Sequence, residues 1–519
     1  MLHPIDIGVL LVYLSGLFVL GAWFARKNVD TEAYFLGGRR IKGWVIGLSL
    51  VGTSISSITF LAYPGDAYKT AWLRFLPNLM LPLAVVIAAR YFLPFFRRGK
   101  TVTAYEYLED RFGPSIRLYG AAAFIVAQTV RVSLILYLVS LVLQEITGLS
   151  AIWCIVIGGG VVAVYTVMGG IEAVIWTDVI QTVVLLVGGV VCLAVILVAL
   201  PGGFEQLIDV AVRDGKLAFA ELRGGQLEPV SFGFSLQNKT VTMMLLIGLM
   251  SWLTEYSSNQ NTVQRFCASA SDREAKKAVY ICAAVSVPTW AFFMFLGTAL
   301  YVFFQVFPTL ESGEILDGVR KAEEIMPYFI AEYLPYGLVG LVIAATLAAA
   351  MSSLDSSINA ISAVMMFDVY RRYAKRQRSE RSQVRMAQLV AAFSAVLMVV
   401  GAILLAQSET KTLQDTATIL TSLLAGGLLS IYGIGFFTKR GDARHILFGI
   451  AGTMVFTGWS LMSARGVLPE AVRLPLDLYY AGLVGNVVMF VLAFGLSFLV
   501  VSNKDTTGLT IWSRPEVDQ

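Results

Sequence analysis

The sequence predicts an all-α integral membrane protein with about thirteen transmembrane helices. Of its 519 residues, 57% are hydrophobic and 14% are charged, whereas soluble domains average about 25% charged residues. Apolar runs of roughly 20 residues, the length that crosses a bilayer, also recur along the whole chain. The expected spans lie near residues 5–25, 44–68, 75–97, 118–147, 150–169, 176–200, 240–260, 275–305, 335–368, 384–407, 415–437, 443–463 and 478–502.

Loop charges predict the orientation, because cytoplasmic loops carry an excess of Lys and Arg. With the N-terminus outside, 26 of the 39 Lys and Arg residues, Arg265 among them, lie in cytoplasmic segments, and 11 lie in outer segments. Arg90 and Arg131 fall inside spans. An odd number of spans then places the C-terminus inside. We therefore expect a multi-pass protein of the cell inner (plasma) membrane, surrounded by lipid.

Several functional classes are disfavoured by the sequence. The net charge of +4 follows from the loop asymmetry and does not indicate nucleic-acid binding. The longest segments outside the spans, 201–239 and 306–334, are both outer, and the C-terminal tail is too short for an appended signalling domain, which argues against a membrane signalling input module. Asp178 and Asp355 invite comparison with a hydrolase dyad, but no protease motif surrounds them. The sequence therefore does not predict an enzyme.

Two of the expected spans are interrupted. The second contains Gly52, a run of Ser and Thr between residues 53 and 59, and then Pro64-Gly65. The seventh ends in "TEYSSNQN" (254–261) where apolar residues should continue. Discontinuous helices at matching positions of two halves indicate the midplane binding site of a secondary transporter. No residue-level repeat is evident between 44–200 and 240–437, so the break positions alone support this symmetry.

A polar stripe interrupts the ninth span in "AAAMSSLDSSINAIS" (348–362). At 100° per residue, the positions Ala349, Ser352, Ser356 and Asn359 share one face of a helix. Small residues allow close helix packing in membranes, but packing does not explain Asp355, because a charge inside the bilayer is costly. Hydroxyls, freed carbonyls and one carboxylate form an oxygen set that suits Na⁺ better than Ca²⁺ or Mg²⁺.

Two further charged residues lie in or beside spans, and each has two interpretations. Asp178 begins a span, where an acid is also favoured by the helix macrodipole. Arg131 lies about ten residues from either end of its span. It either forms a structural ion pair, with Glu255 or Asp355 as partner, or binds a substrate carboxylate through its two-pronged guanidinium.

Several motifs together resemble the sodium:solute symporter family. They are "AYFLGGRR" (33–40), "TSISSITFLAYPGDAY" (53–68), "TAYEYLEDRF" (103–112), "YTVMGGIEAVIWTDVIQ" (165–181), "NQNTVQRF" (259–266) and "AATLAAAMSSLDSSINAIS" (344–362). The resemblance spans about residues 5 to 440. It implies a leucine-transporter-type core of two inverted five-helix repeats. The implied division is a leading helix and cytoplasmic loop (1–43), a first repeat (44–200), an extracellular loop (201–239), a second repeat (240–437) and two trailing helices with a short tail (438–519).

Within this family the motifs are most similar to those of the bacterial sialic acid symporters. That resemblance implies a first sodium site with carbonyl ligands from Gly52, Ile55 and Ala349 and hydroxyl ligands from Ser352 and Ser353. It implies a second sodium site on Asp178, Ser352, Asp355 and Ser356. The implied substrate contacts are Ser54, Ser56, Thr59, Asn78 and Arg131.

Some positions depart from the sialic acid branch. Asp355 stands where the branch has Ser, Asn78 replaces a longer amide, and Arg74 occupies an aromatic position. The sequence therefore predicts a Na⁺-coupled symporter that imports a small organic anion, sialic acid first, by alternating access. A neutral sugar or another carboxylate remains the alternative substrate.

Overall fold

The computed structural model describes residues 3–98, 101–223, 225–374, 379–407, 427–500 and 504–513. The described parts of the chain are almost entirely helical, with one small hairpin. The helices are α1 (Pro4–Ala25), α2 (Thr31–Leu36), α3 (Gly43–Ser54), α4 (Tyr63–Lys69), α5 (Leu81–Ile87), α6 (Leu93–Arg98), α7 (Glu106–Phe112), α8 (Pro114–Thr147), α9 (Ala151–Ala199), α10 (Gly203–Arg213), α11 (Val241–Ser258), α12 (Gln260–Ala268), α13 (Asp272–Val306), α14 (Leu310–Asp317), α15 (Ile325–Tyr333), α16 (Leu338–Val364), α17 (Arg371–Tyr373), α18 (Glu380–Gln407), α20 (Leu428–Phe437), α21 (Ala443–Ala464) and α22 (Ala481–Leu499).

Shorter 3₁₀ and π segments extend or join these helices. The π-helical turns Ile58–Ala62, Ala88–Phe92 and Met365–Tyr370 continue into α4, α6 and α17, and the 3₁₀ segment Trp72–Met80 precedes α5. The antiparallel hairpin consists of β1 (Ala220–Arg223) and β2 (Gln226–Pro229).

Within the described ranges, nine helices are long and apolar enough to cross a membrane, or ten if the bent pair Gly43–Ser54 and Ile58–Lys69 is one span. The expected spans 150–169 and 176–200 both lie within α9, which is 49 residues long and kinks at Gly170 (φ 63°). A positive φ is accessible to glycine at little cost, so the "MGG" sequence permits this kink. The span expected at 415–437 begins outside the described residues, and α20 covers its end. The count of thirteen stays a prediction.

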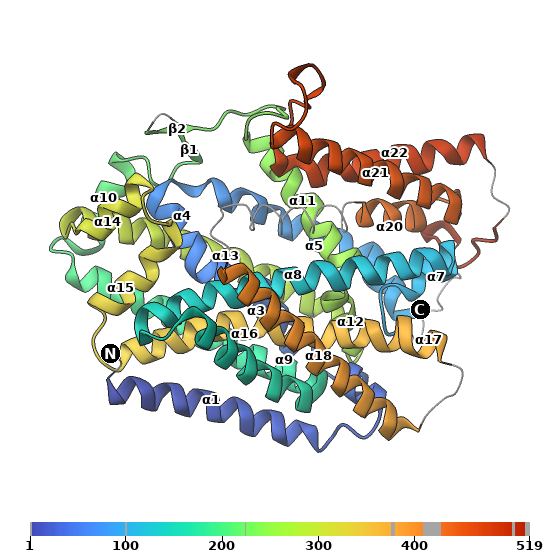
Figure 1. The fold of residues 1–519 in the computed structure, drawn as a ribbon, viewed down its shortest axis with the longest axis horizontal. Helices are drawn as coiled ribbons and strands as arrows, with labels where there is room; N and C mark the ends of the chain where they lie inside the picture. The colour runs from blue at the N-terminus through green and yellow to red at the C-terminus, as the bar shows by residue number, and fades with distance from the viewer. Residues whose placement is uncertain are drawn as a thin grey trace.

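Helix α16 is the central helix of the fold, and α1 is peripheral. In the apolar window of the span Leu338–Tyr373, 83% of residues are buried inside the protein, compared with 17% for Pro4–Ala25. Figure 1 shows α1 along one edge of the molecule and α21 and α22 along the opposite edge. The α16 helix packs most extensively against α9. The polar stripe of the ninth span therefore lies in the protein interior, not at lipid.

The two ends of the helical bundle differ in what they carry. The N-terminus lies at the same end as α10, α14 and α15, whereas α7 and α17 lie at the other end (Figure 1).

A buried lysine connects two segments at the first of these ends. Lys216 follows α10 and donates hydrogen bonds from Nζ to the carbonyls of Tyr68 (2.7 Å) and Thr70 (3.0 Å). Its Nζ also lies 4.0 Å from the ring centre of Tyr301. Burial lowers the pKa of Lys216 to about 8. This lysine ties the segment after α10 to the end of α4.

Candidate functional site

The first interrupted span is broken at Ile55, as its sequence predicts. Helix α3 ends at Ser54, Ile55 is extended (φ −100°, ψ 105°), and the two halves are bent by 58°. Hydroxyl side chains compete with the helical backbone for hydrogen bonds, and the Ser56 hydroxyl accepts one from the amide of Ile58 (3.2 Å). A helix end leaves its last carbonyls without amide partners. The break therefore presents carbonyl oxygens inside the protein.

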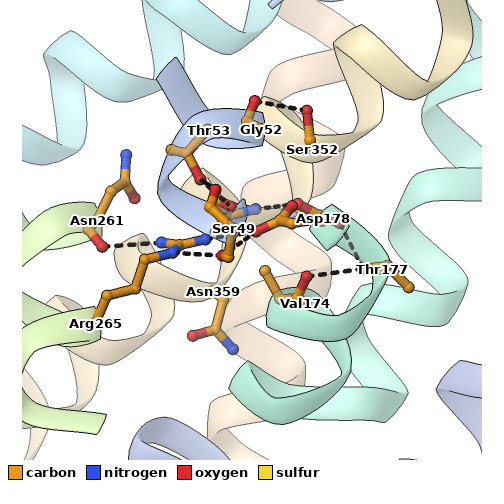
Figure 2. Close-up of polar contacts among 12 residues, drawn as sticks. Ser49, Gly52, Thr53, Val174, Thr177, Asp178, Asn261, Arg265, Ser352 and Asn359 are labelled. Atoms are coloured by element: carbon orange, nitrogen blue, oxygen red, sulfur yellow. Dashed lines mark hydrogen bonds and ion pairs between the residues drawn. The ribbon is translucent and has the colours of Figure 1, made fainter. Parts of the chain in front are cut away.

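The polar stripe of α16 faces this break. The Ser352 hydroxyl donates to the Gly52 carbonyl (2.8 Å) and contacts the carbonyl of Ala349 (3.3 Å). The Ser353 hydroxyl lies 3.4 Å from the carbonyl of Thr53. Figure 2 shows the Ser352 side chain directed at Gly52. The structure thus brings together Gly52, Ala349 and Ser352 of the expected first sodium site and places Ser353 beside it.

The second interrupted span is broken at Asn259. Helix α11 ends at Ser258, Asn259 is extended (φ −81°, ψ 119°), and α12 begins at Gln260. The Asn259 side chain caps the new helix by accepting from the amide of Asn261 (3.0 Å). Both breaks that the sequence predicts are therefore present, and each is followed by a second helical segment.

The fully buried Arg265 of α12 lies at the centre of a polar cluster between three helices. Its Nη2 atom donates to Asp178 Oδ2 (2.8 Å) and to the Ser356 hydroxyl (2.6 Å), and Nε donates to the Ser49 hydroxyl (2.8 Å). The Ser49 hydroxyl in turn donates to Asp178 Oδ2 (2.5 Å). Figure 2 shows Ser49 of α3, Asp178 of α9 and Arg265 of α12 converging, and Ser356 joins them from α16. The charges of Arg265 and Asp178 neutralise each other, which lowers the free-energy cost of burying either one.

Counting Arg265 among the cytoplasmic loop charges is wrong. The low hydropathy of "NQNTVQRF" (259–266) marks the end of a span in the sequence, but α12 runs on through the protein interior, and Arg265 is fully buried. The macrodipole interpretation of Asp178 is also wrong, because Asp178 lies more than two turns beyond the kink at Gly170. The signal for Arg265 was Asp178 itself, since pairing with a cation is one of the ways in which a buried carboxylate is stabilised.

Asp355 occupies a different environment from Asp178. Its Oδ2 accepts from the hydroxyls of Tyr165 (2.8 Å) and Thr177 (3.4 Å), and Oδ1 accepts from the amide of Ser356 (2.5 Å). Within the described parts of the chain it forms no ion pair. The four residues expected at the second sodium site therefore have separate partners: Ser352 contacts Gly52, Asp178 and Ser356 contact Arg265, and Asp355 contacts Tyr165 and Thr177.

Arg131 on α8 is half-buried and has no hydrogen-bond or ion-pair partner among the residues that the structure describes. Glu255 and Asp355 are the two partners considered for a structural ion pair. Asp355 accepts hydrogen bonds from Tyr165 and Thr177 instead. Glu255 accepts from the Asn259 amide (2.6 Å) and the Thr262 hydroxyl (2.7 Å). The described residues thus give the structural ion pair no support, and the guanidinium is left with unused donors.

The other expected substrate contacts lie at or near the first break. Ser54 and Ser56 flank Ile55, and Thr59 is the second residue of the segment Ile58–Ala62 that follows the break. The Asn78 amide donates to the Tyr63 hydroxyl (2.7 Å). Arg74 forms an ion pair with Asp66. A cavity of about 480 Å³ lies between α8 and α11, and its described lining includes Gln128, one helical turn before Arg131, but none of the five expected contacts.

The chain has relatives among known sodium-coupled transporters. A model of the sodium:solute symporter family matches residues 34–452. The chain is 31% identical to the sodium/sialic acid symporter SiaT of Proteus mirabilis (strain HI4320), over 93% of this chain and 92% of that protein. It is 29% identical to the sodium/sialic acid symporter NanT of Aliivibrio fischeri (strain ATCC 700601 / ES114), over 93% and 91% of the two chains.

A solved structure of a Na⁺-coupled sialic acid symporter, in a substrate-bound outward-open state, superposes with a TM-score of 0.86. The two chains are 29% identical, and the superposition covers 97% of this chain and 99% of the other. This likeness confirms the predicted fold class, an all-α leucine-transporter-type core with discontinuous helices. The relatives are sodium-coupled transporters and not enzymes, which also confirms the expected class of activity and its use of Na⁺. The chain belongs to the sodium:solute symporter family.

Proposed function

We propose that this protein imports sialic acid across the inner membrane by Na⁺-coupled alternating access. The observation that carries the proposal is the pairing of the Ser352 hydroxyl with the Gly52 carbonyl at the break between α3 and α4. Oxygen ligands from two helices meet there in the protein interior, where a bound Na⁺ would join the broken helix to α16. The 31% identical SiaT, which is named as a sodium/sialic acid symporter, supports the choice of substrate.

The first Na⁺ is proposed to bind the carbonyls of Gly52, Ile55 and Ala349 and the hydroxyls of Ser352 and Ser353. The Ser352 hydroxyl already contacts the carbonyls of Gly52 and Ala349. An ion that bridges α3 and α16 would exchange these weak contacts for direct coordination. The closure of the break would then depend on Na⁺, which is how an ion gradient drives a conformational change.

The second Na⁺ is proposed to use Asp178 and Asp355, with the hydroxyls of Ser352 and Ser356. In the described structure Asp178 and Ser356 are held by Arg265, so this site requires a rearrangement before it binds an ion. Inward movement of Na⁺ gains ~2.3 kcal/mol per charge per 100 mV. Two ions with one monoanion carry a net charge of +1 inward, so the membrane potential also drives uptake.

The substrate is proposed to contact Ser54, Ser56, Thr59 and Asn78 near the first break, with Arg131 binding its carboxylate. The free donors of Arg131 support this assignment, because a guanidinium fork matches the two oxygens of a carboxylate. A neutral sugar would leave that charge unpaired, so a carboxylate is preferred.

The proposed topology places the N-terminus outside and the C-terminus in the cytoplasm. The proposed units are residues 1–43, the repeats 44–200 and 240–437, the extracellular loop 201–239 and the trailing part 438–519. The position of the N-terminus at the same end of the bundle as α10 supports this arrangement (Figure 1).

Uptake by reconstituted proteoliposomes tests the proposed substrate. Radiolabelled sialic acid, a short monocarboxylate and a hexose are compared with Na⁺ or choline outside. We expect Na⁺-dependent uptake of sialic acid and little uptake of the hexose. If only the monocarboxylate is transported with Na⁺, the protein is a Na⁺-coupled symporter but its substrate is not sialic acid. If no acid or sugar is transported with Na⁺, the proposal is refuted. Binding of a soluble partner to the 369–386 loop, without transport, would instead indicate a signalling module.

A further inference from the structure

The guanidinium of Arg265 lies where the proposed second sodium site needs an ion. A single atom, Nη2, is 2.8 Å from Asp178 Oδ2 and 2.6 Å from the Ser356 hydroxyl. Ca²⁺, a hard cation, binds oxygen ligands at about 2.3–2.6 Å, close to these two distances. An ion that bridged the two oxygens from the side that Nη2 occupies would therefore overlap the guanidinium. The ion and the guanidinium exclude each other at this pair of ligands.

Charge balance favours the same competition. Asp178 and Asp355 are both fully buried, and Arg265 is the cation in contact with Asp178. Among the described residues, Asp355 receives hydrogen bonds only from neutral groups, those of Tyr165, Thr177 and the Ser356 amide. With both acids ionised, Arg265 halves the negative charge of the cluster. It therefore weakens the attraction of the cluster for Na⁺, and its departure would strengthen that attraction.

The position of Arg265 in the fold connects this competition to movement. Arg265 belongs to α12, the segment that follows the break at Asn259, whereas Asp178 and Ser356 belong to α9 and α16. Asp178 Oδ1 has no hydrogen-bond donor among the described residues, although it is fully buried. Arg265 of α12 thus satisfies only one oxygen of this carboxylate, and displacement of α12 would leave both oxygens free to bind an ion.

We propose that Arg265 is a tethered cation that competes with Na⁺ for Asp178 and Ser356. The second ion binds only as the guanidinium leaves, so occupancy of that site is coupled to displacement of α12 from α9 and α16. Arg265 is a positioning residue in this account, since it contacts the ion's ligands and not the substrate. The inference rests on the proposed second sodium site and assigns to that site an internal competitor.

Thermal unfolding of the purified full-length protein, titrated with NaCl against choline chloride, tests the competition. In Arg265→Gln, Na⁺ becomes the counter-ion that Asp178 lacks. We expect this variant to be less stable than wild type without Na⁺. We also expect Na⁺ to restore its stability, with a half-effective concentration at least tenfold lower than for wild type. Arg111→Gln is the matched control, because Arg111 is equally buried but, within the described part of the chain, bonds only backbone carbonyls. Its Na⁺ response should equal that of wild type.

The double variant Asp178→Asn/Arg265→Gln removes both charges and should fold without the enhanced Na⁺ response. The inference would be overturned by a Na⁺ response of Arg265→Gln equal to that of wild type, or by an instability that neither Na⁺ nor choline reduces. An enhanced response that persists in the double variant would also overturn it. Failure of the proposed function looks different, because neither wild type nor any variant would then respond to Na⁺ over choline.

Discussion

Ser352 and Arg131 show how differently two polar residues inside a membrane protein are satisfied. Ser352 bonds the carbonyls of Gly52 and Ala349, whereas Arg131 has no partner among the described residues. The sequence predicted a site at both positions, because a hydroxyl stripe and a mid-span charge both require an explanation. It did not predict Arg265, because the cluster that pairs Arg265 with Asp178 is assembled from helices distant in the chain. Local hydropathy carries no information about such pairing.

Loss of the Ser352 hydroxyl should weaken Na⁺ binding at the first site. Ser352→Ala removes a proposed ion ligand without adding volume, so we expect the Na⁺ concentration for half-maximal uptake to rise on the order of tenfold, equivalent to about 1.4 kcal/mol. Uptake measured over a Na⁺ series gives this value. Ser460→Ala is the matched control, because Ser460 is buried and bonds only the carbonyl of Phe456 in its own helix. An equal Na⁺ dependence of Ser352→Ala and wild type would refute the first site.

Loss of the Arg131 charge should weaken substrate binding and leave the fold intact. Since Arg131 has no partner among the described residues, Arg131→Gln leaves no described carboxylate without its counter-ion. We therefore expect an unchanged melting temperature and sialate affinity reduced at least tenfold, the loss of a charge-assisted hydrogen bond. Arg131→Lys should also bind more weakly, because it loses the fork. Calorimetric binding isotherms give the sialate affinity, and melting curves give the stability. Arg90→Gln is the control, because Arg90 also lies inside an expected span. A large loss of stability would instead restore the structural ion pair.

At the scale of elements, both breaks and the continuation of the first broken helix were predictable, whereas the continuation of the second as the buried helix α12 was not. Gly, Pro and clustered hydroxyl residues interrupt apolar runs visibly, and the structure has breaks at Ile55 and Asn259. The course of the chain after a break depends on packing. Helix α13 packs against both α3 and α4, and it approaches α4 closely because Gly297 has no side chain.

Filling the contact at Gly297 should therefore disturb the second half of the first broken helix, Ile58–Lys69. A Cβ at Gly297 would lie 2.2 Å from the Pro64 carbonyl oxygen and 2.5 Å from its Cα. The backbone of α4 must move, so we expect Gly297→Ala to cost ~1–3 kcal/mol of stability, the range for overpacking, and to reduce uptake. Gly458→Ala is the control, because nothing lies within 4 Å of its Cβ. Melting temperature and uptake are measured for both; equal behaviour would show that the contact is not needed.

For the whole molecule, composition was enough to predict a polytopic helical protein, but not its number of spans. The "MGG" sequence separates two expected spans that the structure joins through a kink at Gly170. Part of the span expected at 415–437 and the charges Lys100, Lys375, Arg376, Arg378 and Arg514 lie outside the described residues. The orientation follows from loop charge, and it stays a prediction that a labelling experiment can test.

Labelling of engineered cysteines should report opposite sides for two exposed positions. The four native thiols are all buried, so their background reaction should be low. Glu228→Cys, in β2, should react with a membrane-impermeant maleimide in right-side-out vesicles. Lys276→Cys, in α13, should react only after the vesicles are opened. Labelling of both from the same side would contradict the proposed topology and the inverted-repeat arrangement that depends on it.

Gradient-driven accumulation tests the central claim most directly. Proteoliposomes that contain the protein are given radiolabelled sialic acid inside and outside at equal concentration, and an inward Na⁺ gradient is then imposed. If Na⁺ and sialic acid are coupled, sialic acid should accumulate inside above the outer concentration, rise further with a negative interior and return to equality when the Na⁺ gradient is dissipated. Equal concentrations throughout, with the gradient intact and the protein folded, would contradict a Na⁺-coupled sialic acid symporter.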